Sequence, residues 1–98
     1  MASKLTSTSA EEIFPRNTLR KSFVIQNEDS AINVYIKRES NGGVSVSNTD
    51  HDHRIGPAGL ISVNNLTDGT EAIQDRWTVV AESGTPRISY FETEDIKR

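Results

Sequence analysis

The stretch LRKSFVIQN, residues 19–27, alternates apolar and polar side chains over most of its length. Leu19, Phe23 and Ile25 fall on one side of an extended chain, and the polar residues Arg20, Ser22 and Gln26 fall on the other side. A period of two is typical of a strand with one buried face. The pattern therefore predicts a strand at this position.

A second alternating segment, residues 31–38, follows after a polar turn at residues 27–30. Within it Ile32, Val34 and Ile36 share one side. Two alternating segments joined by a short polar turn are typical of a hairpin, so we expect these two strands to pair antiparallel.

Further apolar segments of strand length are separated by turns rich in Gly, Asn and Asp. We expect strands at residues 44–46, 60–64, 77–81 and 87–92. The last two should form a second hairpin around the turn at residues 82–86. Since no long segment has a helical period, the sequence predicts an all-β fold, a small antiparallel β-sandwich or barrel of about six short strands.

The first fifteen residues differ from the rest in composition. They are rich in Ser, Thr and Ala, and their main apolar group is the pair Ile13-Phe14. Such a composition is typical of a flexible segment. We therefore expect residues 1–15 to form an extended N-terminal arm and residues 16–98 to form the β-sandwich domain. Ile13, Phe14 and Arg16 are the candidate contacts between the arm and a partner.

Composition also limits the classes of partner. The chain has 98 residues, a net charge of −3 and no cysteine, so it holds one core without disulfides or thiolate metal sites. The apolar content of 34% predicts a thin core, which association with further copies would support. The sequence contains no clustered basic face and no apolar run of about 20 residues, so we expect neither nucleic acid nor membrane as a partner.

Both histidines lie in the stretch NTDHDHRIGP, residues 48–57, each next to an aspartate. The candidate metal ligands are Asp50, His51, Asp52 and His53, because imidazole and carboxylate suit zinc and side chains two apart on an extended chain share a face. Such a site needs two more ligands from elsewhere. A solvated polar loop explains the same residues, and it is the interpretation we favour. A third interpretation places the histidines against their counterparts around a symmetry axis of an oligomer.

Catalytic patterns are weak in this sequence. There is no Gly-x-Ser-x-Gly elbow, and paired carboxylates fall near the ends of the chain, where no pocket would raise a pKa. We therefore expect no enzymatic activity and no cofactor. Trp77 begins an apolar strand and is expected in the core or at an interface; only a solvent-facing Trp77 beside Tyr90 would favour carbohydrate binding.

A family resemblance adds to these inferences. The order RKSFVIQN (20–27), a turn and AINVYI (31–36) resembles the opening of small β-sandwich virion proteins of tailed bacteriophages. The GPAG turn at residues 56–59, the aromatic strand from Trp77, the Gly-Thr turn and the strand at residues 88–92 continue the similarity. It covers residues 16–92, and the loop at 65–76 departs from the family pattern by being longer and more acidic.

The resemblance implies a structural protein located in the virion after synthesis in the host cytoplasm. The function that it most directly implies is that of a capsid decoration (cement) protein, and such proteins are commonly trimeric. The protein would bind the major capsid protein or other virion proteins. It would stabilise the assembled head through its arm and its oligomeric β-domain. One alternative is a neck or tail connector or a fibre-attachment module. Another, from a different class, is a carbohydrate-binding module for host recognition that uses Trp77, Tyr90 and the His/Asp loop.

Overall fold

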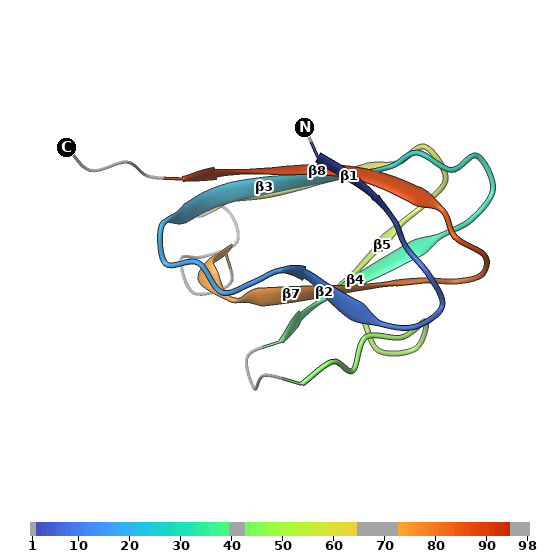
Figure 1. Cartoon of the computed structure of the whole chain (residues 1–98), viewed down its shortest axis with the longest axis horizontal. Coiled ribbons are helices and arrows are strands. Elements are labelled where there is room, and N and C mark those ends of the chain that lie inside the picture. Colours follow the sequence, from blue (N-terminus) through green and yellow to red (C-terminus); the bar gives the residue numbers. More distant parts are fainter. Residues whose placement is uncertain (1, 40–42, 65–72, 95–98) are drawn as a thin grey trace.

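The computed structural model of the chain describes residues 2–39, 43–64 and 73–94, which form an all-β sandwich. Its strands are β1 (Ala2–Leu5), β2 (Glu11–Phe14), β3 (Arg20–Asn27), β4 (Val34–Glu39), β5 (His53–Ile55), β6 (Leu60–Asn64), β7 (Arg76–Ala81) and β8 (Arg87–Glu94). The first sheet has the order β1-β8-β3-β6, and the second has the order β2-β7-β4-β5. Figure 1 shows the two sheets face to face, as the sequence predicts for a β-sandwich.

The strand pairing has a nested order. β1 pairs with β8, β2 with β7, β3 with β6 and β4 with β5, all antiparallel. This is the pairing of one long hairpin, and the additional pairs β3–β8 and β4–β7 show that the hairpin has rolled into two sheets. An eight-stranded sandwich built in this way is a jelly roll.

Both predicted hairpins are wrong, although their strands exist. β3 and β4 are consecutive but lie in different sheets, and so do β7 and β8. At the first crossing Asn27 is fully buried, and its Nδ2 lies 2.7 Å from the carbonyl oxygen of Ile32 and 3.1 Å from that of Ile55. Asn27 belongs to the first sheet, and its side chain bonds to the segment leading into β4 and to β5, which both lie in the second sheet. The buried amide therefore stabilises the crossing of the chain from one sheet to the other.

The predicted N-terminal arm is also wrong, because residues 2–14 belong to the sandwich. β1 lies at the edge of the first sheet and β2 at the edge of the second. Ile13 is 8% exposed and Phe14 is 3% exposed, and the Phe14 ring lies 4.7 Å from that of Phe23. Edge strands keep one side in water, so a Ser- and Thr-rich composition suits them as well as it suits a flexible segment.

The core is a single layer of side chains between the sheets. Phe23, Ile25, Val34 and Ile36 have no exposed surface, as their alternation predicts. Further members of the same cluster are Ile55, Val63, Ile73, Val79 and Ile88. The predicted strand at residues 44–46 is absent, whereas β1, β2 and β5 were not foreseen and raise the number of strands from about six to eight within the described residues.

The alternation fails at the start of β3. A shift of register between Arg20 and Ser22 leaves Leu19 outside the strand and 52% exposed, whereas Arg20 turns inward. Its Nε lies 2.6 Å from Oε2 of Glu92, and its Nη1 donates to the carbonyl oxygens of Ile73 (2.8 Å) and Asp75 (2.9 Å). A buried guanidinium thus joins three distant segments at one end of the sandwich.

Candidate partner-binding face

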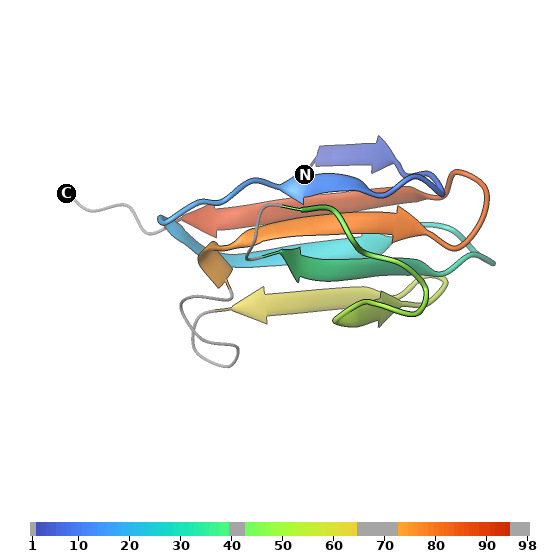
Figure 2. The ribbon, with the colours of Figure 1, turned by 90° about the horizontal axis from the view of Figure 1, so that it is seen from below.

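The outer face of the second sheet is covered by the segment of residues 43–52. In Figure 1 this segment runs below β7 and β4, on the side away from the first sheet, and Figure 2, which is seen from below, shows it in front of these strands. Val46 is 4% exposed and packs with Tyr35 and Val80 in a second, smaller apolar cluster. The segment is therefore a fixed cover for this face.

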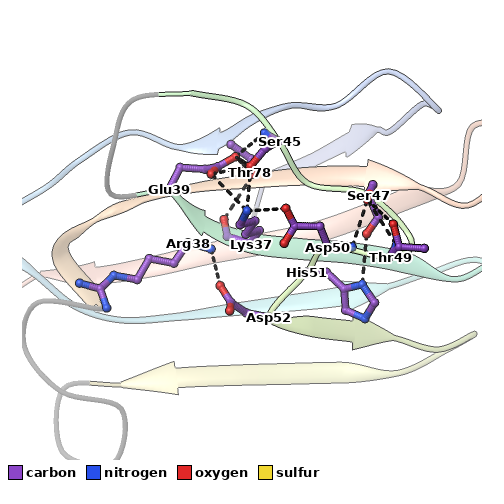
Figure 3. Close-up of polar contacts among 10 residues, drawn as sticks. All are labelled: Lys37, Arg38, Glu39, Ser45, Ser47, Thr49, Asp50, His51, Asp52 and Thr78. Carbon is purple, nitrogen blue, oxygen red and sulfur yellow. Dashed lines mark hydrogen bonds and ion pairs between the residues drawn. The ribbon is translucent and has the colours of Figure 1, made fainter.

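Polar contacts hold the cover in place (Figure 3). The carboxylate of Glu39, a residue only 8% exposed, accepts hydrogen bonds from the backbone N–H of Ser45 at 2.6 Å and from Oγ1 of Thr78 at 3.3 Å. Nζ of Lys37 lies 2.7 Å from Oδ2 of Asp50. The hydrogen bond to Asp50 is the main cause that raises the pKa of Lys37 above 10.5, against a smaller lowering by desolvation.

The two aspartates proposed as metal ligands have separate partners. Asp50 pairs with Lys37, and Oδ2 of Asp52 accepts the backbone N–H of Arg38 at 2.7 Å. Each carboxylate therefore joins the cover to β4.

The two histidines do not share a face, so the predicted alignment is wrong. The His51 ring lies 4.6 Å from that of Tyr35 on the outer side of the second sheet. The His53 ring stacks on Trp77, with centroids 6.1 Å apart. Across residues 2–39, 43–64 and 73–94, no three His, Cys, Asp or Glu side chains gather closely enough to hold a metal ion.

The outer face of the first sheet has a different composition. Strand register and alternation place the following residues on it: Ser3, Leu5, Ser22, Val24, Gln26, Leu60, Ser62, Asn64, Arg87, Ser89, Phe91 and Thr93. We call this set the β8 face. Its one charged member is Arg87, although 26% of the whole chain is charged. The exposed Lys21, at the register shift between Arg20 and Ser22, has no paired residue on β8 and is not counted in the set.

The β8 face also presents apolar side chains. Leu60 is 60% exposed, Leu5 is 55% exposed and Phe91 is 39% exposed. In Figure 1 no described segment lies over the outer side of this sheet. The face is therefore a flat surface of small polar and apolar side chains, which loses little hydration energy when another protein covers it.

The remaining predicted site residues lie elsewhere. Ile13 and Phe14 are core residues of the sandwich and not contacts on a free arm, whereas the Arg16 side chain is 70% exposed, with Nη1 3.9 Å from Oδ1 of Asp75. Trp77 is 3% exposed and packs edge-on against Phe23 at 5.1 Å. The carbohydrate-binding alternative requires a solvent-facing Trp77, and the burial of Trp77 contradicts this requirement.

A second polar cluster lies at the turn after β7. The carboxylate of Glu82 accepts Nδ2–H of Asn33 at 2.6 Å and the hydroxyl of Tyr35 at 2.9 Å. The bond from Asn33, followed by that from Tyr35, lowers the pKa of Glu82 below 4.5. Burial, followed by the bond to Glu82, raises the pKa of Tyr35 above 10.0. This cluster fixes the turn against β4.

No family model, curated protein or solved structure matches the chain. No helix among the described residues is both long enough and apolar enough to cross a bilayer.

Proposed function

We propose that the protein is a structural component of a tailed-phage virion, most directly a capsid decoration protein that binds the assembled head. The observation that carries the proposal is the β8 face, a sheet surface that no described segment covers, whose paired positions include one charged residue and on which Leu5, Leu60 and Phe91 are exposed. Depletion of charge and exposure of large apolar side chains are the features that distinguish the centre of a protein interface.

The fold supports the proposal by analogy. Jelly rolls recur in viral capsid proteins, although they also occur in lectins and other binding proteins. A fold alone does not assign a function, so the argument rests on the face and uses the topology only as a second, weaker support.

The mechanism we propose uses a preformed surface in place of an arm. The β8 face lies on paired strands, so binding through it does not require ordering of a flexible segment at about 1–2 kcal/mol per residue. Covering one large apolar side chain contributes about 1.5–3 kcal/mol. A protein that binds only the assembled shell stabilises it by about 2.7 kcal/mol per site at a hundredfold excess over the Kd.

The proposed partner is the major capsid protein or another protein of the virion, and we propose that the chain has no enzymatic activity. The trimer implied by the family resemblance remains a prediction, which sedimentation equilibrium of the purified chain would test. A neck or tail position, as a connector or fibre-attachment module, is the second candidate, since the same face suits either partner.

Electron microscopy of purified empty heads mixed with the protein tests the proposal. A decoration protein gives saturable extra density over the whole shell. Density confined to one vertex assigns the protein to the neck or tail. If neither heads nor tails of the phage bind the protein, the proposed function is wrong.

A further inference from the structure

The edge of the first sheet is only partly paired. β1 lies beside β8 from Leu5, opposite Arg87, to Ala2, opposite Tyr90. On the other side of β8, the pairing with β3 continues as far as Glu94. Within the described part of the chain, residues 91–94 thus have a neighbouring strand on one side only, and Figure 2 shows β1 beside just one half of β8.

An apolar groove opens next to this edge, beside Ala2, where β1 begins. It has a volume of about 360 Å3 and lies between β8 and β2. Its lining residues are Ala2, Ile13, Phe14, Pro15, Tyr90, Phe91 and Glu92. An unpaired strand edge and an apolar groove are thus found together.

We propose that this edge and groove bind an extended peptide strand of a partner protein, antiparallel to β8 and in line with β1. Main-chain hydrogen bonds to residues 91–94 would supply affinity, and alternate side chains would supply specificity. Ala2 faces inward opposite Tyr90, so by the period of two a ligand residue opposite Glu92 also faces inward. A large apolar side chain at that position enters the groove beside Phe14 and Pro15.

The charges at the edge favour a basic ligand. Inward-pointing charges usually deter strand addition. Here Glu92 is neutralised by Arg20, whose Nε lies 2.6 Å away. The exposed Glu94 accepts a hydrogen bond from Nδ2 of Asn17 at 3.1 Å and has no cationic partner among the described residues. Arg16 follows Pro15 of the groove, but its exposed guanidinium is directed to Asp75 and so does not neutralise Glu94. A Lys or Arg in the ligand strand would therefore pair with Glu94.

The same charges argue against a second copy as the occupant. Two β8 edges paired with each other would place Glu92 and Glu94 of each copy against those of the other, and opposed like charges destabilise strand pairs. The inference extends the proposed function without depending on it, because it uses the main-chain edge of β8 and the groove, whereas the proposed function uses the outward side chains; Phe91 borders both surfaces.

Titration of the 15N-labelled full chain with capped peptides of pattern Lys-Thr-X-Thr-X-Thr-Lys, where X is Val, Ile, Leu or Phe, tests the inference by NMR. We expect saturable shifts of the amides of residues 91–94 for at least one apolar X, and none when X is Asp. Ala2→Phe fills the groove and should weaken binding about tenfold or more, equivalent to 1.4 kcal/mol. Ser3→Phe, on the other side of β1, is the matched control and should bind like the unmodified chain.

A charge reversal gives an independent test. Glu94→Lys should weaken binding of the Lys-flanked peptide about threefold, the size of an exposed ion pair. Glu28→Lys, an equal change of charge at an exposed position near the opposite end of β8, should have no effect.

The absence of shifts at residues 91–94 with millimolar peptide, or equal binding by Ala2→Phe and Ser3→Phe, would overturn the inference. Dimerisation of the chain with shifts at the same amides would assign the edge to a second copy and would also overturn it. Capsid binding is measured separately, so its failure is distinguishable from failure of the peptide experiment.

Discussion

At the scale of single residues, Arg20 closes one end of the sandwich. Its side chain has no exposed surface and is bonded to Glu92 and to the carbonyl oxygens of Ile73 and Asp75. We expect Arg20→Met to lower the free energy of unfolding by about 3 kcal/mol, because the carboxylate and the carbonyls lose their donor. Urea unfolding would measure this. Lys21→Met, at the exposed next residue, should change stability by less than about 0.5 kcal/mol.

A second residue-scale prediction concerns Glu82. Removal of the main donor in Asn33→Ala should raise the pKa of Glu82 toward 4.5, and Tyr35→Phe should raise it by a smaller amount. Because the pKa of Glu82 is lowered in the folded state, its contribution to stability is present above pH 4.5 and is lost as the pH falls through the folded-state value. Carboxyl 13C titrations would show the shift. An unchanged Glu82 titration in Asn33→Ala would refute the assignment.

Residue positions were predictable where one face of a strand meets the core. Phe23, Ile25 and Ile36 follow from alternation alone. Arg20 does not, because a register shift that no local pattern indicates turns it inward. His51 and His53 fall on different faces because one precedes β5 and packs on the outer side, whereas the other is a residue of β5 itself.

At the scale of elements, β1 and β2 are integral to the sandwich. Deletion of residues 1–15 removes both edge strands together with the buried Ile13 and Phe14, which contribute about 1.5–3 kcal/mol each. Since small domains have only about 5–15 kcal/mol of stability, we expect the truncated chain to be largely unfolded. Circular dichroism and NMR dispersion would measure this. A native spectrum of the truncated chain would contradict this expectation and would support the prediction of a flexible arm.

The cover of the second sheet gives another element-scale prediction. Val46 is 4% exposed and its near neighbour Val44 is 46% exposed, so the two form a matched pair. Val46→Ala should lower the free energy of unfolding by about 1–2 kcal/mol, through lost burial and a residual cavity. Val44→Ala should change it by less than about 0.5 kcal/mol. Similar effects of the two substitutions in urea unfolding would mean that the cover does not pack as described.

Strands were predictable from the sequence more readily than their pairing. Apolar alternation located β3, β4 and β6, and apolar content located β7 and β8. The short polar strands β1, β2 and β5 have few apolar residues to signal them. Adjacency along the chain predicted hairpins, but whether a turn reverses within one sheet or crosses to the other depends on tertiary contacts such as those of Asn27.

At the scale of the whole molecule, the two outer faces differ. The second sheet has Lys37, Glu39 and Arg76 on its outer side and is covered by residues 43–52. No described segment covers the outer side of the first sheet, and Arg87 is the one charged residue at its paired outward positions. A hint of the face was present in the sequence, because half of the members of the β8 face in β3, β6 and β8 are Ser, Asn or Gln, and none is Lys or Glu. Only the sheet order shows that these positions form one surface.

The central claim is that the β8 face binds the assembled phage head. Affinity for purified heads can be measured by cosedimentation for Leu5→Glu and Leu60→Glu, at the two opposite edges of the face, with Val44→Glu as a control on the covered side. Native circular dichroism of each variant would show that it is folded. We predict that each face variant binds about tenfold or more weakly, a loss of 1.4 kcal/mol, and that Val44→Glu binds like the unmodified chain. Unchanged affinity in both face variants would contradict the account.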